Sequence, residues 1–77
     1  MPKSFRSISG KSMVKLIGKV GFFEVSQKGS HIKVKRVENS ETDVVIIPNH
    51  KELTPGTFRS ILKMAGLSLE EFDKINK

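Results

Sequence analysis

Residues 22–48, FFEVSQKGSHIKVKRVENSETDVVIIP, decide the fold. In order, they have the patterns of a strand over 22–27, a turn over 28–30, a strand over 31–37, a turn over 38–42 and a strand over 44–47. The middle strand alternates Ile32 and Val34 with polar residues, whereas the third is apolar on both faces and is closed by Pro48. This pattern predicts a three-stranded antiparallel meander.

A helical pattern precedes the strands. Ser9 can cap a helix that Gly21 ends, and its apolar stripe is Met13, Leu16, Ile17 and Val20. Gly18 interrupts this pattern at a cost of about 1 kcal/mol relative to Ala. The sequence therefore predicts a first helix that packs one face against the sheet.

Two further helices are predicted after the strands. Thr54 as cap and Pro55 at the first helical position open one that Gly66 stops, with a buried stripe of Phe58, Ile61, Leu62 and Ala65. Ser68-Leu69-Glu70-Glu71 is a capping box for a short last helix with Phe72 and Ile75. We therefore predict one α+β domain over residues 1–77, with the helices on one face of an antiparallel sheet.

The composition excludes several classes. The chain has 77 residues and no cysteine, so disulfides and thiolate chemistry are absent, and two histidines alone cannot form a closed structural zinc site. It has no apolar run of about 18 residues, and its N-terminus lacks the apolar core of a signal peptide. We expect a soluble cytoplasmic protein with no membrane contact, no metal and no other cofactor.

Positive charge is concentrated in the first half of the chain. Residues 1–40 carry nine basic and two acidic residues, a net +7, whereas residues 41–77 carry five basic and six acidic, a net −1. A polyanion would therefore bind the first half, and nucleic acid is the obvious candidate. A solvated basic face without a partner is an equally good explanation of charge alone.

The strand pattern places one histidine within this basic half. If Ile32 and Val34 face the helices, His31 and its neighbours at alternate positions share the opposite face. The candidate RNA-binding residues are Lys28, Ser30, Lys33, Lys35 and Arg36. Taken alone, a surface histidine beside lysines is more often incidental than catalytic.

The chain resembles the HicA family of toxins, the small RNA-cleaving partners in HicA–HicB toxin–antitoxin pairs. The blocks that carry the resemblance are Ser9-Gly10-Lys11, Gly21-Phe22, Gln27-Lys28-Gly29-Ser30-His31, Ile47-Pro48-Asn49-His50-Lys51-Glu52-Leu53 and Gly56-Thr57 through Arg59-Ser60-Ile61-Leu62 to Ala65-Gly66-Leu67-Ser68. The resemblance implies a fold like that of double-stranded-RNA-binding domains, helix-strand-strand-strand-helix, here with a short extra C-terminal helix. It also implies a toxin that cleaves mRNA and so inhibits translation and growth, with His31 as the catalytic residue. One departure is that Ile32 stands where typical members often carry an aromatic residue.

Residue chemistry is compatible with this role. RNA cleavage without a metal needs a base for the 2′-hydroxyl proton, cations for the charge on the phosphorane and an acid for the leaving oxygen. A histidine, with an ordinary pKa of about 6.5, is suited to be the base. His50 is the auxiliary candidate for the acid, although a role in tying its loop to the second long helix is the better explanation of that residue.

The residues also bear on three other function classes. A non-catalytic RNA-binding module would use the same basic face and would not need His31. A magnesium nuclease is disfavoured because the carboxylates are spread over a turn, a loop and the last helix. Serine-nucleophile hydrolysis is disfavoured because Ser30 lies in no nucleophile elbow.

The third strand has a second apolar face, which we expect another part of the chain or a partner protein to cover. Residues 44–47 are apolar on both faces, yet helices on one side of the sheet can bury only one of them. Either the last helix folds over the second face through Phe72 and Ile75, or another protein covers it. The resemblance names that protein as a HicB-like antitoxin.

Overall fold

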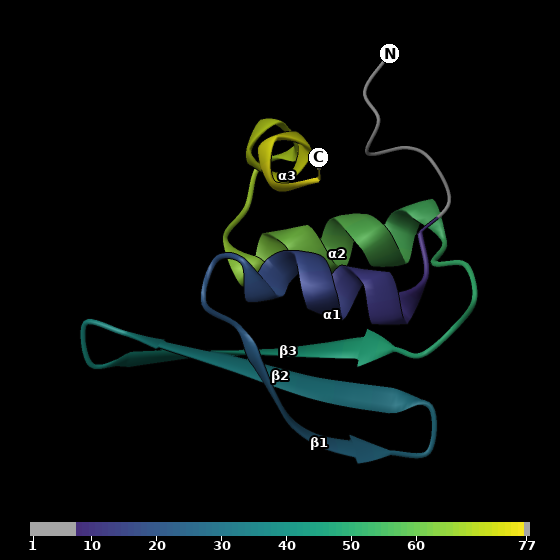
Figure 1. The fold of residues 1–77 in the computed structure, drawn as a ribbon, viewed down its shortest axis with the longest axis horizontal. Helices are drawn as coiled ribbons and strands as arrows, with labels where there is room; N and C mark the ends of the chain where they lie inside the picture. The colour runs from purple at the N-terminus through teal and green to yellow at the C-terminus, as the bar shows by residue number, and fades with distance from the viewer. Residues whose placement is uncertain (1–7, 77) are drawn as a thin grey trace.

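The structure is a computed structural model that describes residues 8–76. Its elements are, in chain order, α1 (Gly10–Gly18), β1 (Phe23–Lys28), β2 (His31–Glu38), β3 (Glu41–Pro48), α2 (Pro55–Ala65) and α3 (Leu69–Ile75). The N-terminal segment, with Lys3 and Arg6, lies outside the described residues, as does Lys77. Helices α1 and α2 lie side by side over one face of the sheet, and α3 lies further out on the same side (Figure 1). The predicted α+β fold with the helices on one face is therefore confirmed.

The sheet is an antiparallel meander in the order β1-β2-β3. Both hairpins have two-residue loops, and both strands of the second hairpin extend beyond the predicted 31–37 and 44–47. The extension is possible because Asn39 and Ser40 adopt φ values of 51° and 67°, which give the tight turn that matches the twist of paired strands. Only asparagine of the two enters this conformation readily, which is why the sequence pattern suggested a longer loop.

Helix α1 begins where predicted and ends earlier. The Ser9 hydroxyl accepts a hydrogen bond from the Ser12 N–H at 3.1 Å, and Met13 and Ile17 are completely buried. The α-helix stops at Gly18 rather than at Gly21, so Gly18 ends the helix instead of interrupting it. Gly21, with φ 104°, then turns the chain into β1.

Helix α2 begins and ends where its capping residues predicted, and α3 begins where its capping box predicted. Thr54 caps α2, Gly66 ends it with φ 72°, and the capping box at the start of α3 is fully formed. Phe72 packs edge-on against Phe58, with the ring centroids 5.0 Å apart, and the Lys19 ammonium donates to the Ile75 carbonyl at 2.8 Å. Helix α3 is therefore held on the helix side and does not cover the other face of the sheet.

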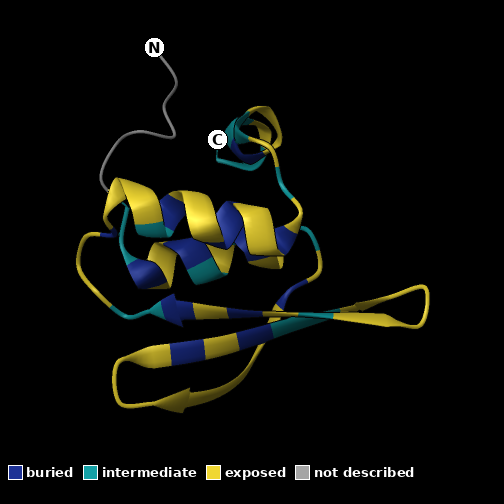
Figure 2. Cartoon of the chain, turned by 180° about the vertical axis from the view of Figure 1, so that it is seen from behind, coloured by how far each residue is buried: buried dark blue, intermediate teal, exposed yellow. Residues whose placement is uncertain are grey.

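One hydrophobic core lies between the sheet and the helices. It consists of the buried side chains Met13, Ile17, Phe22, Ile32, Val34, Val45, Ile47, Leu53, Phe58, Ile61, Leu62, Ala65 and Phe72. Over residues 31–34 of β2 the burial alternates, whereas β1 is exposed throughout (Figure 2). None of the helices among the described residues is long and apolar enough to cross a membrane.

Candidate functional site

The face of the sheet that the helices leave uncovered contains most of the predicted site. Residues paired across antiparallel strands point to the same face, so the pairing arranges their side chains in rows. We call this the open face, and its three rows nearest His31 are Lys28, His31 and Pro48; Ser26, Lys33 and Ile46; and Phe23, Lys35 and Val44. A bulge at Val25 shifts β1 by one residue between the second and third rows. Without that shift Phe23 would belong to the other face.

His31 lies at the first residue of β2, directly after the turn that joins β1 to β2. Gly29 has φ 57° in this turn, and its Cα has open space around it, so the backbone can approach a ligand closely. Lys28 is paired with His31, and both residues are exposed, as is Ser30. The turn thus presents an imidazole, an ammonium group and a hydroxyl to solvent.

The loop after β3 holds this turn in place. The Asn49 N–H donates to the Ser30 carbonyl at 2.6 Å, and the Gly10 N–H donates to the His50 carbonyl at 2.9 Å. His31 and His50 each follow a residue of the first hydrogen bond, so the loop brings the two histidines to the same end of the sheet. His50 is exposed, and its carbonyl ties the loop to α1, not to α2 as the sequence suggested.

The N-termini of α1 and α2 lie at this same end of the molecule (Figure 1). A helix N-terminus carries a partial positive charge from its aligned peptide dipoles. Both helices therefore direct the positive ends of their dipoles toward the end of the molecule where His31 lies.

Charged side chains of the strands are divided between the two faces of the sheet. The lysines of the strands, Lys28, Lys33 and Lys35, are all on the open face. The acidic residues of the strands all fall on the other side of the pairing, with Glu24 opposite Val34, Asp43 opposite Arg36 and Glu38 opposite Glu41. Among the described strand residues, the open face therefore carries cations and no carboxylate.

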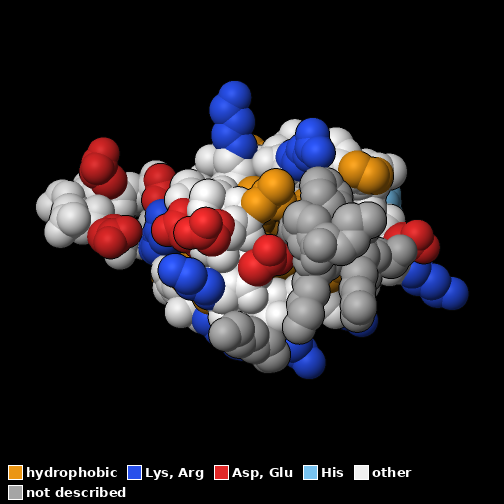
Figure 3. Space-filling view, turned by 90° about the horizontal axis from the view of Figure 1, so that it is seen from above, with side chains coloured by type: hydrophobic (Ala, Val, Ile, Leu, Met, Phe, Trp, Pro, Cys, Tyr) orange, Lys and Arg blue, Asp and Glu red, His pale blue; other side chains and the backbone are white. Residues whose placement is uncertain are grey.

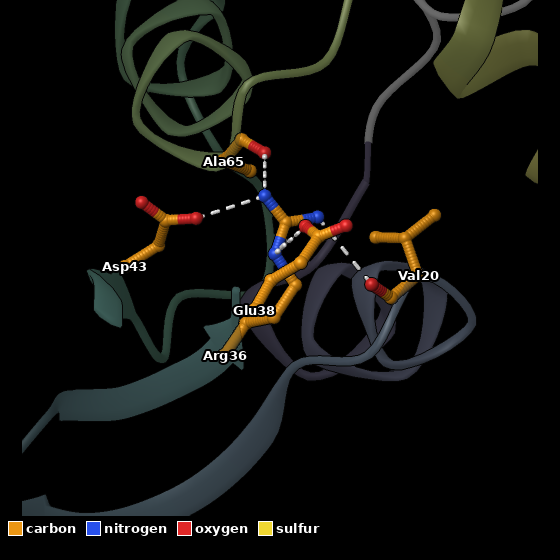
Figure 4. A network of polar contacts seen from close by, with 5 residues as sticks. All are labelled: Val20, Arg36, Glu38, Asp43 and Ala65. Carbon is orange, nitrogen blue, oxygen red and sulfur yellow. Dashed lines mark hydrogen bonds and ion pairs between the residues drawn. The ribbon is translucent and has the colours of Figure 1, made fainter. Parts of the chain in front are cut away.

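Arg36 is not part of the open face. Its guanidinium lies on the helix side of the sheet, where it donates to the Asp43 carboxylate at 2.9 Å and to the Ala65 carbonyl at 3.3 Å (Figure 4). It also donates to the Val20 carbonyl at 3.4 Å and stacks on the Phe22 ring at 4.6 Å from the centroid. The structure thus separates Arg36 from the other predicted RNA-binding residues, and Arg36 instead joins the end of α2 and the turn after α1 to the sheet.

Carboxylates are unevenly distributed over the helix side. Most acidic side chains lie toward the end where the β2–β3 hairpin projects and over the centre of the molecule, and a further one lies at the opposite end, near a histidine (Figure 3). Within residues 8–76, no three histidine or carboxylate side chains lie close enough to hold a metal ion together.

The structure adds apolar residues that the sequence interpretation did not assign to the site. On the open face Phe23 is 51% exposed, and Val44 and Ile46 are 42% and 43% exposed. An exposed apolar face on residues 44–47 was predicted, and the structure assigns it to Val44 and Ile46, which alternate with buried residues. Phe23 could not be found, because either of two adjacent phenylalanines could have entered the core.

The fold and the open face define a small α+β domain, compatible with the architecture of double-stranded-RNA-binding domains, whose uncovered sheet is basic. A family model described as HicA toxin of bacterial toxin-antitoxin matches residues 10–67, which is three-quarters of the chain. The chain therefore belongs to the HicA toxin family. No curated protein matches it.

Family membership makes this protein a toxin of a toxin–antitoxin system, which implies a cognate antitoxin. The matched range contains the whole sheet, both long helices and the loop with His50, and it leaves out α3. The residues that form the open face thus all lie within the family's common part.

Proposed function

We propose that this toxin is a metal-independent endoribonuclease that cleaves mRNA with His31 as the general base. The observation that carries the proposal is the position of His31. It is an exposed imidazole on a face that has three lysines and no carboxylate among the described strand residues, in a member of a toxin family.

His31, its neighbouring lysines and Ser30 have distinct roles in this reaction. The His31 imidazole takes the proton from a ribose 2′-hydroxyl, whose oxygen attacks the adjacent phosphorus while the bond to the 5′-oxygen breaks. Lys28, paired with His31, and Lys33, one row away, stabilise the charge that develops on the phosphorane. Lys35 and the Ser30 hydroxyl hold the flanking RNA backbone. Arg36 is left out of this set because it is engaged on the other side of the sheet.

A second group must protonate the leaving 5′-oxygen. His50 is the auxiliary candidate, because it is exposed and follows Asn49, whose N–H bonds to the residue before His31. Substituting each histidine in turn therefore separates the contribution of the proposed base from that of the proposed acid.

The test compares purified wild-type, His31→Ala and His50→Ala proteins on RNA in the presence of EDTA. We expect the wild type to cleave and His31→Ala to be inactive, with circular dichroism unchanged because His31 is exposed and surface substitutions change stability by about 0.5 kcal/mol or less. Cleavage by His31→Ala would refute the assignment of the base. A wild type that binds RNA without cleaving it would instead support a non-catalytic RNA-binding module.

We further propose that an acidic, HicB-like antitoxin docks on the open face around His31, Lys33 and Lys35 and so excludes RNA. The exposed apolar side chains of the open face, such as Val44 and Ile46 on the edge strand, support this docking site. Helix α3 does not cover them, so they are available to a partner. Opposite charges would speed association, with an on-rate that falls as salt rises.

Hydrogen exchange of the complex tests the docking face. We expect slower exchange in residues 28–36 and 44–47 when the antitoxin is bound, with residues 55–65 of α2 as the internal control. Unchanged exchange in the first two segments would show that inhibition does not occur through this face.

A further inference from the structure

We propose that Phe23, with Lys35 beside it, forms a subsite that stacks a nucleobase of single-stranded RNA a few nucleotides from the cleaved phosphodiester. The inference rests on the proposed function and adds to it a binding residue outside the family blocks noted in the sequence. Phe23 and Lys35 are directly paired across β1 and β2. An aromatic ring next to an ammonium group is the combination with which proteins hold single-stranded nucleic acid, the ring for a base and the cation for a phosphate.

Phe23 is exposed, in contrast to its neighbour in the sequence. Its neighbour Phe22 is 5% exposed and lies beneath the Arg36 guanidinium in the core, whereas Phe23 is 51% exposed on the open face. Burying a phenylalanine side chain would contribute favourably to folding, and this domain leaves the ring in water. The ring is thus available to a ligand.

Phe23 is the exposed phenylalanine of the described part of the chain. Phe22, Phe58 and Phe72 are all buried, and His31, the other aromatic ring of the open face, is assigned to the cleavage step. The position after His31 cannot supply a stacking contact either, because Ile32 is 3% exposed and points into the core. A phenylalanine that stacks a base on this sheet must therefore come from β1.

The spacing fits a strand of RNA that crosses the sheet. Lys35 is four residues along β2 from His31, which corresponds to about 13 Å. Lys33 lies between them on the same face, so cations accompany the path from the catalytic imidazole to the Phe23 ring. The absence of carboxylates from the described strand positions of this face removes electrostatic repulsion along the path.

The test measures binding of a short single-stranded RNA in the His31→Ala background, so that cleavage does not interfere. We expect Phe23→Ala to raise the Kd about 5- to 150-fold, the factor that corresponds to 1–3 kcal/mol of base stacking. Phe23→Trp should bind at least as tightly as the parent, and Phe23→Leu, which keeps apolar area without a ring, should resemble Phe23→Ala. Met64→Ala is the matched control, because Met64 is 48% exposed on α2 and should not change the Kd.

An abasic strand of the same length separates stacking from other effects. Phe23→Ala should lose its effect on this ligand, whereas Lys35→Ala should weaken binding of both strands because its contact is to phosphate. An equal loss on both strands would overturn the stacking proposal. So would unchanged RNA binding together with weakened antitoxin binding, which would assign the ring to a protein interface.

Failure of the subsite and failure of the proposed function have different signatures. If wild type cleaves RNA and Phe23→Ala binds it normally, only the subsite is wrong. If wild type neither binds nor cleaves RNA, the proposed function is wrong as well.

Discussion

The contact between α1 and the loop beside the turn predicts that Gly10→Ala destabilises the protein. Gly10 is buried at the first residue of α1, and a Cβ there would overlap the Pro48 carbonyl oxygen. That Cβ would also lie 2.9 Å from the Pro48 carbonyl carbon and 3.0 Å from the Asn49 Cα. All three obstacles are backbone atoms, which cannot rotate away as a side chain could.

The expected loss of stability can be estimated, because α1 and the loop after β3 must move apart to admit the Cβ. Separating the helix from the loop strains or breaks the hydrogen bond from the Gly10 N–H to the His50 carbonyl, a contribution of about 0.5–1.5 kcal/mol. Overpacking of a filled site costs typically about 1–3 kcal/mol, and the higher helix propensity of alanine returns up to about 1 kcal/mol. We therefore expect a net loss of about 2 kcal/mol, or roughly 8–16 °C in Tm for a domain of this size.

A glycine at the other end of the same helix provides the control. A Cβ at Gly18 would meet no atom within 4 Å, and Gly18 is exposed. Gly18→Ala should therefore stabilise the protein by about 0.4–1 kcal/mol through the unfolded state. Urea unfolding followed by circular dichroism, with all proteins carrying His31→Ala, measures both values. Equal stabilities for Gly10→Ala and Gly18→Ala would refute the close approach of α1 to the loop.

Four further outcomes concern α3 and the lysines. Phe72→Ala should cost about 3–5 kcal/mol in calorimetry, because the ring is 1% exposed against α2. Ser68→Ala should cost about 1 kcal/mol, because it removes the N-cap hydrogen bond of α3. The hydrogen bond that the Ser68 backbone N–H donates lowers the pKa of the Glu71 carboxyl. The stability that the Glu71 carboxylate contributes is therefore present above its unfolded pKa of about 4.3 and is lost as pH falls through the lowered pKa, an effect that acid titration of wild type should show and Glu71→Gln should not. Neutralising Lys33 and Lys35 should reduce the salt slope of RNA binding by roughly 0.7 per lost contact.

Short-range signals in the sequence were sufficient to predict where the helices begin. The N-cap residues Ser9, Thr54 and Ser68 each accept the hydrogen bond that was predicted, because a cap depends on residues three positions away. Gly66 ends α2 for a similarly local reason, its positive φ. Local chemistry of this kind can be recognised without knowledge of the tertiary fold.

The strands depended on information that the sequence pattern does not contain. The bulge at Val25 and the choice of Phe22 over Phe23 for the core are settled by how β1 pairs with β2, which is a tertiary property. Arg36 is a different case. Alternation with Ile32 and Val34 already placed it on the helix side, but the charge of the first half of the chain suggested a shared RNA surface.

The two faces of the sheet have different roles in this small domain. The helix side contributes the hydrophobic core, and the open face carries the residues proposed to bind RNA. Every buried residue of the strands lies on the helix side, and Arg36 adds its ion pair and carbonyl contacts there. Residues on the open face contribute little to the core, so substitutions at Lys33 or Lys35 should change affinity without unfolding the protein. The exception is the backbone path from Gly10 through the loop after β3 to Ser30, because it is buried at one end and adjoins His31 at the other. In a toxin built in this way, residues of the open face can change independently of the fold, whereas the position of His31 stays coupled to the packing of α1.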